Sequence, residues 1–395
     1  MIDLAISLAG RRLPAYGSNS ILELVRWVGA RLKRDGGEGA MAAPDGVPGE
    51  GGQRLVLALF DGLGDHYLGG PGASSAMRMA RRSALTSVFP STTASAVTTM
   101  MTGLSPATHG LNGWVCRGHD GVGLFEPLPM IYHETCKPLR HPVRRRRLFP
   151  YRSLYQGLGC TAFVISPAWL IDSDFSRHHS RGAAVAGYSA LDEVPELLAF
   201  ALERLGPRGL VYLYFPQFDA TAHDFGMASA QLQQIFGELD DCFAALAACC
   251  EAGDATLLAT ADHGLIDAPE AEMICLGAEP AIASMLAMPL WGERRAAFCA
   301  LRPGMEAAFR EAIEARWPGR IDVLSGAQVI DAGLLGPGRP HRDLDVRVGD
   351  LLLLPRGGGT VVDAAAPQEV HRLVAVHGGL SAQEMSVPLL VSGAH

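Results

Sequence analysis

Lysine is nearly absent from this chain, and its scarcity excludes several kinds of site. The only lysines are Lys33 and Lys137, and neither lies in the G-x-x-x-x-G-K-[ST] pattern of a phosphate-binding loop. A covalent mechanism through a lysine Schiff base has almost no candidate residue either. With 33 basic and 41 acidic residues, the formal net charge is −8. The chain therefore lacks the positive field on which nucleic-acid binding depends, and we expect no nucleic-acid partner.

The chain also lacks paired cysteines and long apolar runs. It has eight cysteines, but none of them form a C-x-x-C pair, and no disulfide framework is evident. The most apolar window, residues 281–291, is 11 residues long and contains a serine and a proline, which makes it too short to span a bilayer. The first residues show neither the basic flank nor the long apolar stretch of a signal peptide. These absences predict a reduced, cytoplasmic protein without a membrane span.

Three segments share one pattern, an apolar run that ends abruptly in polar residues. They cover residues 55–61, 210–219 and 255–263. Continuous rather than alternating apolar residues are typical of strands that are buried on both faces, as in a parallel sheet covered by helices. Helical patterns lie between these runs, for example at 229–251. With 395 residues, the chain is predicted to form a doubly wound α/β fold, a mostly parallel sheet between helices, with a small inserted α+β cap.

Shifts in pattern divide the chain into four parts. Residues 1–54 are predicted to hold a surface helix at 18–33, capped within Ser18 to Ser20, and a mobile loop at 35–53 that packs with it on the core. Residues 55–272 form the core. Residues 273–360 contain two strand-like runs, a helix and a turn-rich segment, and are interpreted as the inserted cap. Residues 361–395 return the chain to the core and carry His377.

Acidic and histidine side chains gather where the predicted strands end. The candidates are Asp61, Asp219, His223, Asp262, His263 and, after a short apolar run, His377. Asp219 and His223 are four residues apart, so one helical turn would direct both at a single point. Aspartate and histidine together are ligands that zinc accepts, with iron or manganese as alternatives. One strand-end aspartate more often caps a helix, and one histidine is more often a surface or core residue. Only their joint position at one sheet edge favours a site for two divalent ions.

Residues 89–113 contain a candidate nucleophile. After Pro90 the run of small and hydroxyl residues predicts a helix whose core-facing residues include Val97, Met100 and Met101. A hydroxyl in its first turn would meet free N–H groups and the positive end of the helix dipole, which is a good position for an anion. Beside a bound metal such a hydroxyl becomes a nucleophile. The alternative is that these threonines only cap the helix.

Taken together, the motifs resemble those of the alkaline phosphatase superfamily, and within it the type I phosphodiesterase/nucleotide pyrophosphatase group. The matching pieces are LFDGLG, FPSTT, TGLSPATHG, FDATAHDFG, TADHGL and HGG, in the order of that family. The resemblance implies one zinc ion held by Asp219, His223 and His377, and a second held by Asp61, Asp262 and His263. It also implies that Thr93 is the nucleophile and a further metal contact, with Thr92 the less favoured neighbour.

The resemblance implies a zinc-dependent phosphodiesterase that acts through a phosphothreonine intermediate on a small phosphodiester, with a nucleotide as one candidate. Other divalent transition metals are an alternative to zinc. The family has a phosphate-binding asparagine where this chain has Trp114. Asn112, two residues away, is a candidate replacement, and Trp114 is a candidate for stacking on an aromatic leaving group.

Other functions stay open at this point. On the same scaffold they are phosphomonoester hydrolysis, cleavage of a phosphonoacetate-type C–P bond and phosphate transfer. A non-catalytic, metal-binding component of a defence system is the alternative from another class. The basic run Arg144 to Arg147 is interpreted as a solvated loop, with anion binding as its alternative. The sequence does not indicate the oligomeric state.

Overall fold

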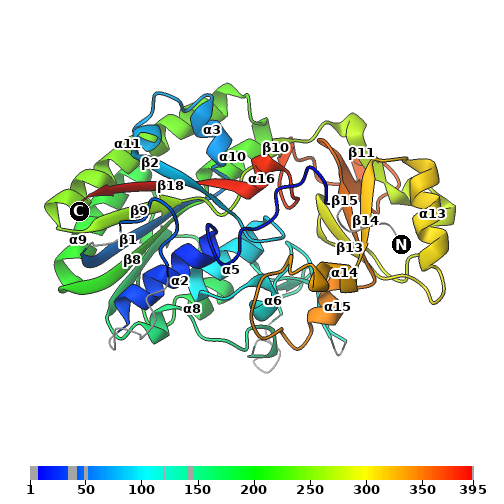
Figure 1. The fold of residues 1–395 in the computed structure, drawn as a ribbon, viewed down its shortest axis with the longest axis horizontal. Helices are drawn as coiled ribbons and strands as arrows, with labels where there is room; N and C mark the ends of the chain where they lie inside the picture. Colours follow the sequence, from blue (N-terminus) through cyan, green and yellow to red (C-terminus); the bar gives the residue numbers. More distant parts are fainter. Residues whose placement is uncertain (1–7, 34–41, 49–51, 120, 140–145, 394–395) are drawn as a thin grey trace.

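The larger part of the molecule is built around a seven-stranded sheet (Figure 1). The computed structural model describes residues 8–33, 42–48, 52–119, 121–139 and 146–393. The order of the strands across the sheet is β2-β18-β9-β1-β8-β6-β7. Their bounds are β1 Gln53–Phe60, β2 Arg81–Thr86, β6 Thr161–Pro167, β7 Ala184–Tyr188, β8 Arg208–Phe215, β9 Thr256–Thr260 and β18 Ser386–Gly393. The five strands from β9 to β7 are parallel, and β18 runs antiparallel to β9 and β2.

The three apolar runs of the sequence form the centre of this sheet. They become β1, β8 and β9, which are neighbours, with Phe60 opposite Phe215 and Leu59 opposite Thr260. Every residue of β9 and the last six of β1 are buried. Burial on both faces explains why these segments read as continuous rather than alternating apolar runs.

Helices cover both faces of the sheet, which confirms the predicted α/β fold (Figure 1). On one side lie α2 Ile21–Leu32, α5 Thr93–Thr102 and α8 Asp174–His179. On the other side lie α3 Asp65–Gly69, α4 Ala76–Ala80, α9 Val194–Arg204, α10 Gln217–Phe225 and α11 Ala230–Ala252. No helix in the described ranges combines the length and the apolar composition needed to cross a bilayer.

The prediction that 18–33 forms a surface helix was wrong about its environment. Helix α2 is buried on almost every side, and even Glu23 is only 5% exposed. The helix contacts α5, β1 and β8, and only Arg26, Ala30 and Arg31 of it are partly exposed. Ser20 is its N-cap, but the Ser20 hydroxyl donates to the Glu23 carboxylate instead of capping the backbone. Of the predicted loop at 35–53, residues 34–41 and 49–51 lie outside the described residues. The described Asp45 is tied to Asn19 by two hydrogen bonds.

A second sheet, four-stranded and antiparallel, lies beside the first (Figure 1). Its order is β12-β13-β15-β14, with bounds β12 Trp291–Glu293, β13 Ala296–Cys299, β14 Ile321–Ser325 and β15 Leu351–Pro355. Its helices are α12 Pro280–Ala283, α13 Glu306–Arg316, α14 Gly326–Asp331 and α15 Leu344–Val348. The elements anticipated between 273 and 360 are therefore present. The boundaries of a separate cap stay a prediction.

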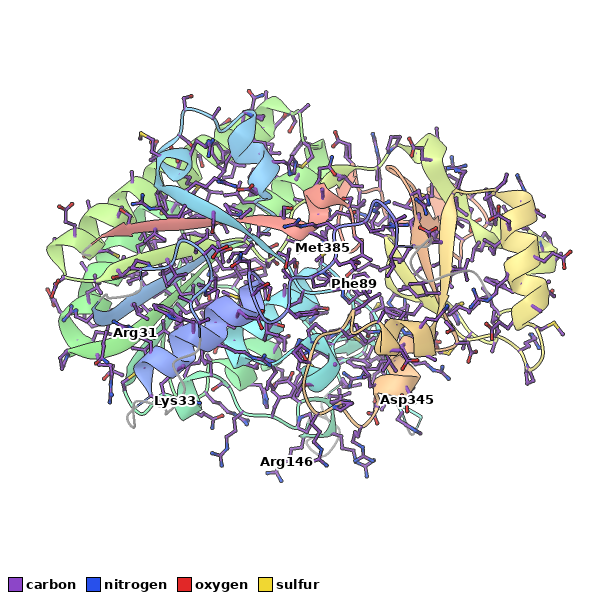
Figure 2. All side chains as sticks on the ribbon, viewed as in Figure 1. Arg31, Lys33, Phe89, Arg146, Asp345 and Met385 are labelled. Carbon is purple, nitrogen blue, oxygen red and sulfur yellow. The ribbon has the colours of Figure 1, made fainter. Side chains whose placement is uncertain are left out.

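An apolar core joins the two sheets. Phe89 and Met385, labelled in Figure 2, pack in one buried cluster with Trp291 and Phe298 of the second sheet. Short elements complete the connection: α6 Pro106–His109, α16 Ala382–Met385, β3 Cys116–Arg117, β4 Leu124–Glu126, β5 Ile131–Tyr132, β10 Ile266–Asp267, β11 Met273–Cys275, β16 Thr360–Val362 and β17 Ala375–Val376. Because buried apolar side chains span both parts, the second sheet is packed against the first rather than tethered to it.

Candidate metal centre and nucleophile

The acidic residues of the candidate site come from the carboxyl ends of the three central strands. Asp61 follows β1, and Asp262 follows β9 by two residues. Asp219 lies in the first turn of α10, directly after β8. Parallel neighbouring strands end at the same edge of a sheet, and that edge is where ligands bind in open α/β folds. The strand order therefore accounts for the convergence of the three carboxylates.

The histidines reach the same place by different routes. His263 follows Asp262, and His223 lies one helical turn after Asp219 on α10. His377 follows β17, which pairs with β10 and not with the main sheet. Its approach therefore depends on a separate two-stranded sheet rather than on a strand end of the core.

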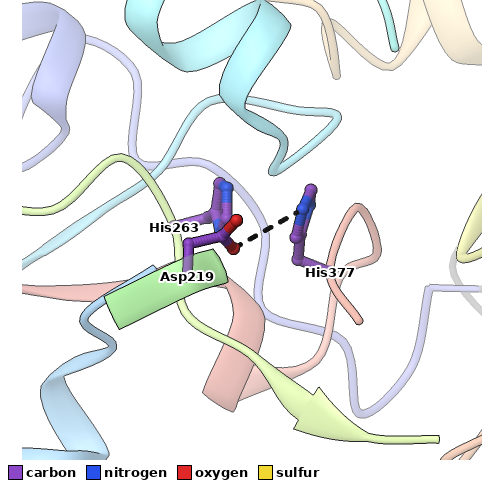
Figure 3. Close-up of side chains that lie close together, drawn as sticks. All are labelled: Asp219, His263 and His377. Carbon is purple, nitrogen blue, oxygen red and sulfur yellow. Dashed lines mark ion pairs between the residues drawn. The ribbon is translucent and has the colours of Figure 1, made fainter. Parts of the chain in front are cut away.

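Two groups of three side chains have the geometry of metal ligands. In each group, the candidate ligand atoms lie within 4.8 Å of one another. One group is Asp61, Asp262 and His263, as the resemblance implied. The other is Asp219, His263 and His377 (Figure 3), so His263 belongs to both groups. His223 remains next to the second group, with Nε2 3.2 Å from Oδ2 of Asp219.

All three histidines are oriented to present a lone pair to the site. Nδ1 of His223 donates to the backbone oxygen of Ala375 (2.7 Å), that of His377 to Ser91 (3.2 Å) and that of His263 to Gly264 (3.2 Å). A neutral histidine that donates from Nδ1 has its lone pair on Nε2, and a metal ion that binds His223 would have to displace the second proton that its raised pKa places there. Backbone carbonyls commonly orient metal-binding histidines in this way. Each Nε2 lies near an aspartate of the site, at 3.2 to 3.8 Å.

The aspartates also offer atoms that could bind a metal ion. Among the described residues, Oδ1 of Asp61, Oδ1 of Asp219 and Oδ2 of Asp262 are buried and accept no hydrogen bond. Their other oxygens are held, since Tyr214 donates to Asp61 and the N–H groups of Gly62 and His263 donate to Asp262. Buried carboxylate oxygens without a donor are costly unless a cation binds them. The oxygen and nitrogen donors fit one or two divalent ions of the zinc type.

The pKa values of several ionisable side chains in the cluster differ from their ordinary values. Burial and the like charges of Asp262 and Asp219 raise the pKa of Asp61 well above its usual range. Burial acts in the same direction on Asp219, but His223 outweighs it and lowers the pKa of that carboxyl. Burial lowers the pKa of His223, yet Asp219 reverses this and raises it to about 9. Burial also raises the pKa of Asp262, and both Asp61 and Asp262 are repelled by the neighbouring Asp219, so a cation between these carboxylates would relieve the repulsion.

Thr93 lies at the edge of this cluster. It is the first residue of α5, and its Oγ1 is 3.2 Å from Nε2 of His263. The first N–H groups of a helix have no acceptor within the helix, so they and the dipole favour an anion beside Thr93. Thr92 differs, because its hydroxyl donates to Oε1 of Glu293 at 2.5 Å. Of the two threonines, only Thr93 presents its hydroxyl to the Asp/His cluster.

Glu293 is a residue of the site that the sequence did not indicate. It ends β12 in the second sheet, and the same Oε1 accepts the backbone N–H of Trp114 at 2.6 Å. Burial raises the pKa of Glu293. The close approach depends on glycine, because a Cβ on Gly113 would lie 2.4 Å from the Cα of Gly292. The sequence shows the two glycines, but their close approach is visible only in the folded chain.

Asn112 and Trp114 have different environments. Asn112 is 1% exposed, and its side-chain nitrogen donates to the backbone oxygen of Arg347 at 2.7 Å. Its Oδ1 is buried without a partner among the described residues, and its role in substrate binding stays a prediction. Trp114 is 45% exposed, with Nε1 3.2 Å from Oε2 of Glu126. Its indole is therefore available to a ligand.

The basic run at 144–147 contributes nothing described to the cluster. Arg144 and Arg145 lie outside the described residues, and Arg146 is exposed. Figure 2 places Arg146 at the lower edge of the molecule. Its interpretation as a solvated segment stays a prediction.

Comparison with known proteins gives a family match for this chain. The family described as type I phosphodiesterase/nucleotide pyrophosphatase matches residues 55–127 and 137–380. Comparison with curated proteins gives no match.

Among solved structures, murine ectonucleotide pyrophosphatase/phosphodiesterase 5, in an inactive form in complex with AMP, is similar with a TM-score of 0.63 and 16% identity, over 86% of this chain and 88% of that one. The human protein of that name has a TM-score of 0.61 and 18% identity, over 86% and 88%. Phosphonoacetate hydrolase from Sinorhizobium meliloti 1021, in complex with phosphonoacetate, has a TM-score of 0.60 and 16% identity, over 87% and 90%. At these identities the likeness establishes a shared fold.

Proposed function

The chain belongs to the type I phosphodiesterase/nucleotide pyrophosphatase family, and from that premise we propose that it is a zinc-dependent phosphodiesterase with Thr93 as its nucleophile. One observation carries the proposal. Among the described residues, three buried aspartate oxygens without a hydrogen-bond donor lie with His263 and His377 in two overlapping groups of possible metal ligands, and Oγ1 of Thr93 is 3.2 Å from the shared His263. Helix capping or core packing would not leave three buried carboxylate oxygens without a hydrogen-bond donor.

Two ions would be held by the side chains already described. Asp219, His223 and His377 would hold one, Asp61, Asp262 and His263 the other, and Thr93 would lie beside them. Two divalent ions supply charge neutralisation for the phosphoryl oxygens and lower the pKa of a nearby hydroxyl. Zinc suits the mixed aspartate and histidine donors, and other divalent transition metals are the alternative.

The residues of the chain account for the reaction in two steps. Oγ1 of Thr93 bonds to phosphorus while the bond to one ester oxygen breaks, which releases an alcohol and leaves a phosphothreonine diester. The threonine proton leaves, and the departing oxygen gains one. Water then displaces Thr93, restoring its hydroxyl and releasing a phosphomonoester. The free N–H groups at the start of α5 would hold a phosphoryl oxygen throughout.

The surroundings of Thr93 favour a diester over the alternatives on the same scaffold. A phosphomonoester or a phosphonoacetate brings a second negative charge. The Glu293 carboxylate lies directly beside Thr92, and the two lysines, Lys33 and Lys137, belong to other regions. The exposed indole of Trp114 offers a surface for an aromatic ester group. A small phosphodiester, with a nucleotide as one candidate, is therefore the proposed substrate.

The direct test compares bis-p-nitrophenyl phosphate with p-nitrophenyl phosphate, using purified protein loaded with zinc. We expect kcat/KM to be at least about 10-fold higher for the diester, a difference of about 1.4 kcal/mol in transition-state stabilisation. Acid quenching followed by mass spectrometry should locate a phosphoryl adduct on Thr93. A strong preference for the monoester would contradict the diesterase assignment.

The same preparation tests the non-catalytic alternative. A binding component without turnover would take up the metal but hydrolyse none of a panel of diesters. Elemental analysis of the purified protein separates a failure to load zinc from a failure to react. Zinc at two equivalents with no hydrolysis would favour the binding role.

A further inference from the structure

A cavity lies beside Thr93, at the edge of the Asp/His cluster. It is lined by Thr93, Val97 and Met101 from α5, Leu170 from the segment after β6, Phe175 from α8 and Tyr212 from β8. Val97 and Met101 follow Thr93 by four and eight residues, so all three lie on one stripe of α5. The cavity therefore follows the helix from the proposed nucleophile, between α5 and α8, which contact each other.

The walls of this cavity are apolar. Of the described residues that line it, none is charged. Three of its hydroxyl groups donate elsewhere, since Ser173 donates to Ser176, Ser180 donates to the backbone of Ser176, and Tyr214 donates to Asp61. The hydroxyl of Tyr212 is buried and has no partner among the described residues. The bases and sugar of a nucleoside need hydrogen-bond partners, and burying them here would leave several polar atoms without one.

The cavity is small but accessible. Its volume is about 80 Å³, several times the roughly 10–15 Å³ that one buried water molecule needs. Val185, at its rim, is 42% exposed, which places one end of the cavity at the surface. This is room for a short alkyl chain, whereas a cavity that encloses a benzene ring has a volume of about 150 Å³.

We propose that this cavity binds an apolar ester group of the substrate, so that the preferred phosphodiesters carry a short alkyl group rather than a nucleoside there. The inference rests on the proposed function, because the cavity is argued as part of the Thr93 site. Removing apolar surface from water would supply the binding energy, and the walls would exclude charged groups.

A chain-length series tests this in the wild-type protein. The substrates are methyl, ethyl, butyl and octyl p-nitrophenyl phosphate. Each methylene that enters the cavity should raise kcat/KM about threefold to fourfold, so the butyl ester should exceed the methyl ester by about 30- to 60-fold. The gain should stop before octyl because the space is filled. Equal kcat/KM across the series would overturn the inference.

A second measurement separates this inference from the proposed reaction. Isothermal titration with methylphosphonate and butylphosphonate reports the cavity without turnover, and we expect butylphosphonate to bind at least about 10-fold more tightly. If the diesters are not hydrolysed but butylphosphonate still binds more tightly by this ratio, the proposed reaction is contradicted and the assignment of the cavity is supported. If the diesters are hydrolysed with no chain-length effect and no difference in phosphonate affinity, the cavity fails alone.

Two variants place the effect in the cavity. Val97→Phe should fill it and reduce the butyl-to-methyl ratio of kcat/KM to about 1 to 3, whatever happens to the absolute rate. Leu13→Phe is the matched control, since Leu13 is 43% exposed and does not line the cavity, and it should keep the wild-type ratio. If Val97→Phe does not fold, Val185→Trp at the exposed rim provides the same test. An unchanged ratio in a folded variant would refute the assignment.

Discussion

The two sheets contribute to the candidate site in different ways. The seven-stranded sheet supplies reactive groups, because Asp61, Asp219 and Asp262 follow its three central strands. The four-stranded sheet supplies the hairpin between β12 and β13, whose tip carries Glu293 and Arg295. Glu293 contacts the backbone of Trp114 and the hydroxyl of Thr92, while Arg295 pairs with Glu384.

The difference follows from topology. In a parallel sheet every strand ends at the same edge, so one polar residue after each strand is enough to build a cluster. In an antiparallel sheet neighbouring strands end at opposite edges, so polar groups meet only at a hairpin tip. We therefore expect substitutions at the first sheet to act on the chemical step, and substitutions at the hairpin tip to act on stability and positioning.

The largest expected effect on activity is at Thr93. Thr93→Ala removes the proposed nucleophile and should reduce kcat for bis-p-nitrophenyl phosphate by about 10⁴-fold, with the far-ultraviolet circular dichroism unchanged. Thr93→Ser keeps a hydroxyl and should retain much more activity. If the Thr93→Ala protein kept more than about a tenth of wild-type activity, Thr93 would not be the nucleophile. The assignment of the chemical step to the first sheet would then lose its main support.

The next effect is at the candidate metal ligands. Asp219→Asn should lower kcat/KM by more than about 100-fold, since even residues that only support a ligand typically cost 10- to 100-fold. Asp224→Asn on the same helix is the matched control, because Asp224 is exposed. Elemental analysis should show reduced zinc only in the first variant. A chelator should abolish wild-type activity, and added zinc should restore it.

At the second sheet the largest effect should be on stability. Glu384 and Arg295 are 0% and 1% exposed and form two hydrogen bonds. Glu384→Gln leaves a buried cation unpaired and should lower the free energy of unfolding by about 3–5 kcal/mol at pH 7, measured by urea denaturation.

The pH dependence of that effect has a definite sign. Burial alone would raise the pKa of Glu384. The charge of Arg295 and the hydrogen bonds lower the pKa by more than burial raises it, so the net shift is downward. The ionised carboxylate therefore stabilises the fold at pH values above the ordinary glutamate pKa, and this contribution is lost as the pH falls through the lowered pKa. The difference between wild type and Glu384→Gln should shrink in acid. A difference that does not change with pH would show that Arg295 does not depend on this charge.

The smallest expected effect is at Glu293. Glu293→Gln weakens two charge-assisted hydrogen bonds that hold Thr92 and Trp114, and should lower kcat about fivefold to tenfold with little loss of zinc. Glu314→Gln, on the exposed face of α13, is the control and should behave as wild type. A loss as large as that of Asp219→Asn would mean that the second sheet takes part in the chemistry itself.

Several features could be predicted from the sequence because each has a local signal. The buried strands β1, β8 and β9 were visible as continuous apolar runs, and the hydroxyl-rich segment after Pro90 predicted helix α5. Other features had no such signal. Helix α2 showed an apolar stripe and was expected on the surface, but α5 and the sheet cover its remaining sides. An apolar stripe shows which face of a helix is buried, but it does not show what packs against the other faces.

The amino-acid sequence by itself determined which residues follow the buried strands, and with them the aspartates, histidines and threonine from which a site could be built. Only the tertiary structure decided that His263 lies between both groups of ligands, that His377 arrives from a separate pair of strands, and that Glu293 of the second sheet holds Thr92. The reason is physical. Strand and helix patterns arise from neighbours along the chain, whereas contacts such as Thr92 with Glu293 and Asp219 with His377 join residues more than 100 positions apart, whose proximity depends on how the layers pack.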